Sequence, residues 1–388
     1  MKMLMPFYYQ EFKCIGEKCP DSCCKGWRIT VDEDSWRRYQ TLEGDLGEKL
    51  RNSIRLEDGS YAFQLQRKGG RCPLLNDKNL CEIVLERGED LLCTTCATYP
   101  RFARLHGDVM EYGLALSCPE VARILCSIKE PVDFCFFDDG HEIPVNQEID
   151  YAVYNDLLTA RRISIDIAQN RRLKIWERLF VLCMFNQKIQ NMLSSGEPLG
   201  RSHILCDYDK MEYIEQLILE VERIDFQEDK QFIGRFDLVE CFWNNFPDKF
   251  EMYKNIFIKH TENKTAEEII REYKAARKEF SQYHKERSCE YENFIVYWLF
   301  RYYMQSVEDK VLYKNIAMMV LAIIVSRFFA LYPWLENGKE LTIQEQGQIF
   351  SRYSRSIEHD QRIQDALYQK LVEAEHDTVG YMLFLCRD

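Results

Sequence analysis

The cysteines of this 388-residue chain are concentrated near one end of the sequence. Eleven of the sixteen lie within residues 1–135, and four of these fall between Cys14 and Cys24. Three kinds of structure use thiols at this density: a disulfide framework, a set of zinc ions or an iron–sulfur cluster. The first third must therefore fold so that its thiols come together.

The N-terminal residues argue against disulfides. The apolar run Met1–Met5 contains Lys2 and ends at Pro6, so it is too short for the apolar region of a secretory signal peptide. We therefore expect a cytoplasmic protein whose thiols are kept reduced. In that setting structural disulfides are rare, and metal binding accounts better for clustered cysteines.

The spacing of the thiols points to a metal centre. Cys14-x4-Cys19-x3-Cys23-Cys24 is too dense for a regular amphipathic element and predicts a loop that wraps a centre. Cys72 and Cys81 flank a turn, and a Cys-x2-Cys pair follows at residues 93–96.

The type of metal stays open at this point. Only His106 and His141 occur near these cysteines, so a zinc site here would be all-thiolate. An iron–sulfur cluster uses cysteine thiolates and tolerates irregular spacing, which favours it slightly. The adjacent Cys23-Cys24 pair suits a cluster, two centres that share the loop, or one ligand beside a bystander.

Charge and hydropathy exclude two classes of partner. The chain has 63 acidic and 51 basic residues, a formal charge of −12, whereas nucleic-acid binding needs a clustered basic surface. The apolar run from Ile316 is interrupted by Arg327 and ends near Pro333, so it predicts a buried core helix and not a membrane span. We expect neither nucleic acid nor a membrane as a partner.

Periodicity predicts a mainly α protein in two domains. Residues 1–140 would form a cysteine-rich, metal-binding α+β domain, with a first helix capped by Thr30 or Asp32, further helical residues from Leu46, and short strands near Tyr61 and Met110. Residues 134–146 would be a linker, and residues 148–388 an all-α domain. The helices expected in the second domain cover residues 148–170, 172–194, 209–223, 265–280, 288–305, 310–331 and 342–374, the last one broken.

The helix at 288–305 carries a narrow polar stripe. At 100° per residue, Glu290, Asn293, Tyr297 and Arg301 fall within one sector, while most of the remaining surface is apolar or aromatic. One interpretation is an ordinary solvent-exposed face. The other is the wall of a cleft, in which an amide, a phenol and a guanidinium orient a carboxylate or an amine. On the second interpretation Asn293, Tyr297 and Arg301 are the catalytic candidates.

Several motifs together resemble the flagellin lysine N-methylase family. They are Phe12-Lys-Cys14, Cys23-Cys24-Lys-Gly-Trp27, Arg71-Cys72-Pro-Leu-Leu, Cys96-x2-Tyr99-Pro100-Arg101, Leu116-Ser-Cys118-Pro-Glu and the aromatic helix Tyr291–Tyr303. The resemblance implies methyl transfer from S-adenosylmethionine to lysine side chains of flagellin, with a 4Fe–4S cluster as cofactor. The cysteines that it carries over as metal ligands are Cys14, Cys19, Cys23, Cys24, Cys72, Cys81, Cys96 and Cys118, while Cys93, Cys126 and Cys135 are left out.

A different class of function remains open. The sequence has no Gly-x-Gly turn between a strand and a helix, so no Rossmann cradle for S-adenosylmethionine can be recognised. The alternative to an enzyme is a zinc- or iron-binding module or scaffold whose metal only holds the fold.

The metal prediction is tested by analysis of protein purified without oxygen. We expect iron and acid-labile sulfide, because irregularly spaced thiolates suit a cluster. Stoichiometric zinc without sulfide would contradict that expectation. Replacing Cys23 and Cys24 one at a time by serine shows which of the pair is a ligand, since a bystander can be replaced without loss of metal.

Overall fold

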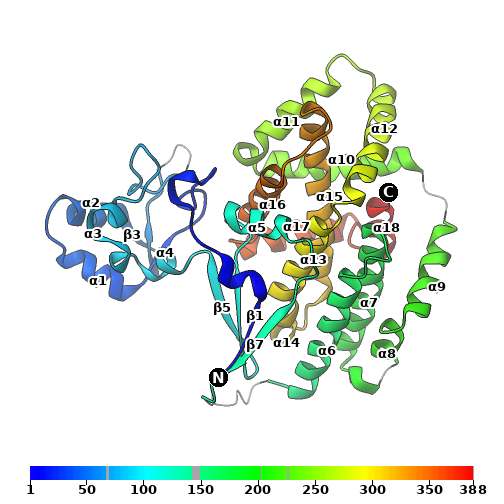
Figure 1. Ribbon diagram of the computed structural model, residues 1–388, viewed down its shortest axis with the longest axis horizontal. Coiled ribbons are helices and arrows are strands. Elements are labelled where there is room, and N and C mark those ends of the chain that lie inside the picture. Colours follow the sequence, from blue (N-terminus) through cyan, green and yellow to red (C-terminus); the bar gives the residue numbers. More distant parts are fainter. Residues whose placement is uncertain (67–69, 142–148, 202, 225–226, 388) are drawn as a thin grey trace.

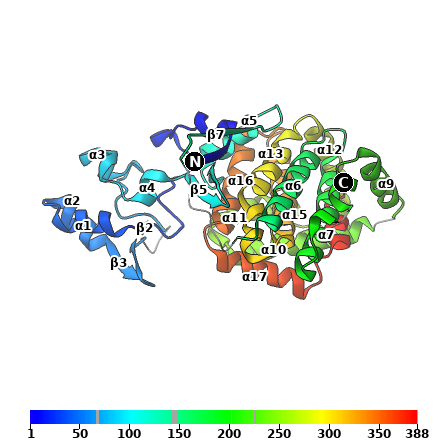
Figure 2. The same ribbon diagram turned by 90° about the horizontal axis from the view of Figure 1, so that it is seen from below.

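A computed structural model describes residues 1–66, 70–141, 149–201, 203–224 and 227–387. They form a cysteine-rich lobe, residues 14–98, beside a large helical body, with a small sheet between them (Figure 1). The view from below shows the lobe projecting from one end of the body (Figure 2). The prediction of a mainly helical protein with a small N-terminal α+β region is confirmed.

The lobe has its own small core. A three-stranded antiparallel sheet in the order β2-β4-β3 packs with four short helices around Tyr39, Leu50 and Ile83. Asp32 caps the first helix by accepting from the Ser35 amide at 2.9 Å, as the sequence predicts. The elements are β2 (Thr30–Val31), α1 (Glu33–Thr41), α2 (Asp45–Ser53), β3 (Ile54–Glu57), β4 (Ser60–Phe63), α3 (Glu82–Arg87) and α4 (Thr94–Thr98).

The sheet between lobe and body has the order β5-β6-β1-β7. β1 (Lys2–Pro6) runs parallel to β6 (Val109–Leu114) and antiparallel to β7 (Phe134–Asp138), while β5 (Arg101–His106) pairs with β6. The interpretation of residues 134–146 as a linker is therefore wrong for residues 134–138, because they pair with β1 along its whole length. Residues 142–148 lie outside the described residues.

The core of the helical body includes part of the first third of the chain. Tyr8, Phe12, Leu116 and Val121 pack in the same cluster as the helices that follow residue 150. The boundary between the two cores thus falls near residues 12–14 and 98–101. The predicted division into 1–140 and 148–388 stays a prediction about folding units, and the packing of side chains divides the chain elsewhere.

All the described residues beyond Asp138 are helical or irregular, which confirms an all-α second part for this portion of the chain. The predicted helical ranges do not include α8, α10, α11, α14 and α18. The helices of the body are α5 (Pro119–Ser127), α6 (Tyr151–Ala168), α7 (Ile175–Ser195), α8 (Ile204–Tyr208), α9 (Met211–Glu222), α10 (Glu228–Asn245), α11 (Pro247–Thr261), α12 (Ala266–Lys285), α13 (Cys289–Tyr302), α14 (Ser306–Asp309), α15 (Tyr313–Glu336), α16 (Ile343–Ile357), α17 (Gln361–Glu373) and α18 (Val379–Cys386).

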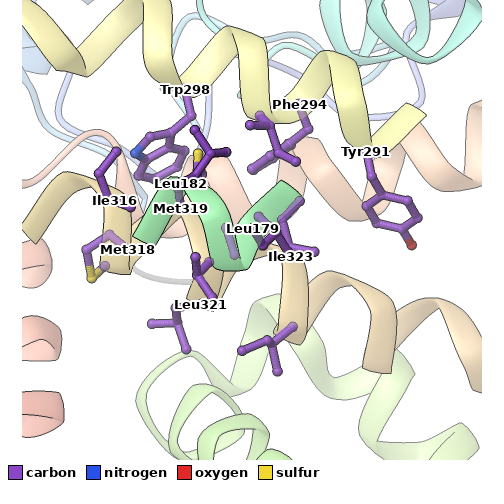
Figure 3. Packing of buried hydrophobic residues seen from close by; sticks show 14 of the residues in the cluster. Leu179, Leu182, Tyr291, Phe294, Trp298, Ile316, Met318, Met319, Leu321 and Ile323 are labelled. Atoms are coloured by element: carbon purple, nitrogen blue, oxygen red, sulfur yellow. The ribbon is translucent and has the colours of Figure 1, made fainter. Parts of the chain in front are cut away.

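α15 is the central helix of the body. Its length and composition would allow it to cross a membrane, but 94% of its most apolar window is buried inside the protein. Figure 3 shows Met319 and Ile323 of α15 packed with Leu179 of α7 and Trp298 of α13. α15 is therefore a core helix, as the sequence predicts.

A buried ion cluster fixes α13 to α7. The Glu292 carboxylate is fully buried and accepts from Arg178 Nη1 at 2.8 Å and Arg171 Nη2 at 2.9 Å. Arg171 is 40% exposed, so the pair of Arg178 and Glu292 is the part of the cluster that is fully removed from water. Removing the carboxylate would leave the buried Arg178 without its counter-charge.

We expect Glu292→Gln to lower the free energy of unfolding by about 3–5 kcal/mol, since it breaks a buried ion pair on one side. Urea titration measures this change. Glu33→Gln is the matched control, because Glu33 pairs with Arg37 at an exposed position on α1 and exposed pairs contribute about 0–1 kcal/mol. Equal losses in the two variants would contradict a structural role for the Glu292 cluster.

Candidate functional site

The candidate site lies where the cysteine-rich lobe meets the end of α16. Arg355 in the last turn of α16 is almost fully buried. Its Nη1 donates to Asp21 Oδ2 at 2.8 Å and to the Ser22 carbonyl at 3.0 Å, while Nη2 donates to the Ser117 carbonyl at 2.9 Å. One guanidinium therefore holds both the loop that contains Cys19, Cys23 and Cys24 and the turn before Cys118.

His359 makes a second connection between the same parts. Its Nε2 lies 2.7 Å from Ser117 Oγ, and its ring stacks on Trp27 with centroids 4.8 Å apart. Trp27 Nε1 in turn donates to the Cys23 carbonyl at 2.7 Å. Burial lowers the pKa of His359 to about 4, so the imidazole is neutral at pH 7.

Between these two residues, Glu358 points into the helical body. Its side chain is only 1% exposed. Glu358 Oε2 accepts from the hydroxyls of Tyr297 and Tyr302, each at 2.6 Å, and lies 3.2 Å from Arg301 Nε. Burial holds the pKa of both phenols well above the usual value, so they are neutral donors to the carboxylate.

Two atoms of this cluster have no hydrogen-bond partner among the described residues. They are Glu358 Oε1 and Arg301 Nη1, and both are buried. The Arg301 guanidinium lies over the Phe102 ring of β5 at 4.4 Å and near the rings of Tyr297 and Tyr302. Buried polar atoms are nearly always paired, so these two atoms are candidates for contact with a bound water or a polar ligand.

Thiols gather on the lobe side of this junction. The Sγ atoms of Cys23 and Cys24 are 3.9 Å apart. Burial raises the pKa of Cys118 to about 12, and the nearby Cys19 and Cys23 thiols act in the same direction. Cys118, far along the chain from the cysteine loop, therefore belongs to the same local group.

A second group of thiols lies within the lobe. Burial raises the pKa of Cys72 to about 12, with Cys81 and Cys93 contributing. A hydrogen bond between the thiols of Cys93 and Cys96 raises the pKa of Cys96, to which Cys24 and Cys72 also contribute. Cys93, which the resemblance leaves out, is thus packed against a predicted ligand.

Thiolates are the ligands that all-cysteine zinc sites and iron–sulfur clusters use, so the residue types suit a metal centre. Within the described part of the chain, however, the His, Cys, Asp and Glu side chains do not come together in threes as ligands for one ion. The metal therefore stays a prediction.

Comparison with known proteins identifies the family. The model of the FliB lysine N-methylase C-terminal domain matches residues 161–385, more than half of the chain. The chain belongs to the FliB lysine N-methylase family. The flagellar biosynthetic protein FliU of Salmonella muenchen is 32% identical over 126 residues, which are 31% of this chain and 75% of FliU.

Two further relatives are named lysine-N-methylase. The proteins of Salmonella typhimurium and Salmonella choleraesuis are each 30% identical over 126 residues, which are 31% of this chain and 31% of each relative. The match thus spans less than a third of the length of these two proteins, whose names support a methyltransferase. No solved structure matches the chain.

The FliB family match covers one side of the junction. Residues 161–385 include α13 with Tyr297 and Arg301, and also Arg355, Glu358 and His359, whereas the cysteine-rich lobe precedes them. The junction therefore joins the matched FliB C-terminal domain to the predicted metal-binding loop.

The structure separates the three catalytic candidates. Tyr297 and Arg301 meet at Glu358, whereas Asn293 Nδ2 donates to the carbonyls of Leu125 and Ile128, both at 2.9 Å, and so caps the end of α5. The interpretation of the stripe as a solvent-exposed face is wrong, because Glu290 and Asn293 are fully buried. α13 packs against α5, α6, α15 and α16, and each of its residues except Arg301 is buried.

Proposed function

We propose that this chain is an S-adenosylmethionine-dependent protein-lysine N-methyltransferase that acts on flagellin in the cytoplasm. The observation that carries the proposal is the meeting of Tyr297 and Arg301 with the buried Glu358, beside the cysteine loop and within the segment matched by the FliB family. The names of the relatives, lysine-N-methylase and flagellar biosynthetic protein, support the reaction and the substrate.

Methyl transfer requires a neutral lysine amine, because the ammonium form has no lone pair to attack the methyl carbon. The junction favours the neutral form. Burial lowers the pKa of Lys249 to about 8, and the nearby Arg355 guanidinium contributes. A substrate lysine that enters the same environment would lose its proton at a similarly reduced pKa.

The remaining requirement is alignment. The new N–C bond forms as the S–C bond breaks, and the excess proton leaves the amine for solvent. Holding the amine, methyl carbon and sulfur in line supplies much of the rate enhancement in such reactions. Tyr297 and Arg301 would hold Glu358 in place, and Asn293 would act by fixing α13 against α5.

We propose a 4Fe–4S cluster as the cofactor of the lobe, with zinc as the alternative. Its ligands would come from Cys14, Cys19, Cys23, Cys24, Cys72, Cys81, Cys96 and Cys118. When bound, the cluster would order the cysteine loop. Nucleic acid and membrane are not part of the proposal, given the charge of −12 and the burial of α15.

The alternative function is a metal-binding scaffold without enzymatic activity. The gathering of thiols favours it as much as it favours the enzyme. S-Adenosylmethionine separates the two functions, because a ligand that binds the folded state raises the melting temperature. A scaffold would show neither this stabilisation nor methyl incorporation into flagellin.

We expect Tyr297→Phe to lower the methylation rate of flagellin about 10- to 100-fold, because it deletes a hydrogen bond to a charged group, worth about 1.5–3 kcal/mol. The ring and its packing stay. The measurement is transfer of labelled methyl groups, alongside metal content, which should change little. The melting temperature should fall, because the Tyr297 hydroxyl also accepts from the buried Leu116 amide at 3.2 Å.

Tyr303→Phe is the matched control. Tyr303 is equally buried, and its hydroxyl donates to Asn186 Oδ1 at 2.7 Å, in a contact separate from Glu358. Full activity of Tyr297→Phe, or an equal loss in Tyr303→Phe, would contradict a catalytic role for the Glu358 cluster.

A further inference from the structure

The inference begins with the two unpartnered atoms at the centre of the candidate site. Glu358 Oε1 is an acceptor on a carboxylate that is 1% exposed, and Arg301 Nη1 is a buried donor. A buried charged group that lacks a hydrogen bond destabilises the fold by a few kcal/mol. Such atoms persist where a ligand satisfies them.

The charges at these atoms restrict the ligand. Glu358 and Arg301 carry opposite charges and compensate each other, with Oε2 and Nε 3.2 Å apart. A simple ammonium group at Oε1 would form an ion pair with the Glu358 carboxylate but would be repelled by the neighbouring Arg301 guanidinium. A simple carboxylate at Nη1 would be attracted by the Arg301 guanidinium but repelled by the Glu358 carboxylate. A group with both charges complements both atoms.

An α-amino-acid zwitterion has this composition. Its ammonium donates hydrogen bonds and its carboxylate accepts them, and the two are joined through one carbon atom. S-Adenosylmethionine ends in such a group. We propose that Glu358 and Arg301 bind the α-ammonium and the α-carboxylate of S-adenosylmethionine.

This inference rests on the proposed function and assigns the cofactor site that the sequence left unknown. An anchor at the methionine end also fits a chain without a Gly-x-Gly turn, because the α-amino-acid group is then fixed by two side chains and not by a glycine-rich loop.

The guanidinium is prepared for this role. The Phe102, Tyr297 and Tyr302 rings surround it, and its Nε already faces Tyr302 at 2.9 Å and Glu358. Its position is therefore set before a ligand arrives, which reduces the entropy lost on binding. The Arg301 side chain is 16% exposed, whereas its Nη1 and Glu358 Oε1 are buried, so the two proposed ligand-binding atoms lie below the surface.

The test compares two ligands by titration calorimetry. S-Adenosylhomocysteine keeps the α-amino-acid end, and 5′-methylthioadenosine lacks it. We expect the wild type to bind S-adenosylhomocysteine at least about 10-fold more tightly than 5′-methylthioadenosine. Glu358→Gln should lower the affinity for S-adenosylhomocysteine alone, by about 10- to 100-fold, so that the variant binds the two ligands with similar affinity.

Glu290→Gln is the control variant. Glu290 is also fully buried on α13 and pairs with an arginine, Arg287, at 2.7 Å. Glu290→Gln should leave the difference in affinity between the two ligands unchanged. An unchanged difference in Glu358→Gln, an equal loss of both ligands, or the same effect in Glu290→Gln would overturn the inference.

If Glu358→Gln does not fold, binding of a modified ligand to the wild type tests the same inference. S-Adenosylhomocysteine acetylated on its α-amine should bind no more tightly than 5′-methylthioadenosine. If both unmodified ligands bind the wild type equally well, this inference fails and the proposed function survives. If neither binds and no methyl transfer occurs, the proposed function fails as well.

Discussion

The structure of the candidate site depends on one buried guanidinium. Arg355 binds Asp21 and Ser22 of the cysteine loop and the Ser117 carbonyl at the same time. The lobe and the body have separate cores, so the loop is fixed to the body by contacts such as these and the stacking of His359 on Trp27. The bond between Arg355 and Asp21 is charge-assisted, and such bonds are about twice as strong as those between neutral groups. The loop, the turn before Cys118 and the end of α16 therefore act as one unit.

Because Arg355, Glu358 and His359 follow one another at the end of α16, their contacts are coupled. Arg355 and His359 face the thiol-rich side, while Glu358 faces Tyr297, Tyr302 and Arg301. A change in the cysteine loop, such as the binding or loss of a metal, would act through this short segment on the carboxylate. On this account the metal of the lobe supports the pocket of the body without touching the reactants.

Much of this architecture follows from local sequence patterns. The capping residue Asp32, the apolar period of α1 and the long apolar run of α15 each predict an element from local sequence alone. Sequence patterns miss β1 and β7 because each exists through pairing with a strand more than 100 residues away in the sequence. Local patterns do not contain that information.

The candidate site, too, could be predicted from local sequence only in part. Tyr297 and Arg301 can be found because they fall on one helical stripe, but that stripe gives no indication that α13 is buried. Glu358 and His359 lie just after a helix, where polar residues are ordinary, and nothing in their spacing points to Tyr297. Cys93 lies within the Cys-x2-Cys pair, a signal that would have included it among the predicted ligands.

The most direct measurement of the central claim is hydrogen exchange of wild type and Arg355→Met, followed by mass spectrometry. If Arg355 joins the loop to the pocket, amides at residues 19–24 and 116–118 should exchange faster in the variant, together with those near Tyr297, while α7 keeps its protection. Unchanged protection of the cysteine loop, or a uniform loss across the whole chain, would contradict the account.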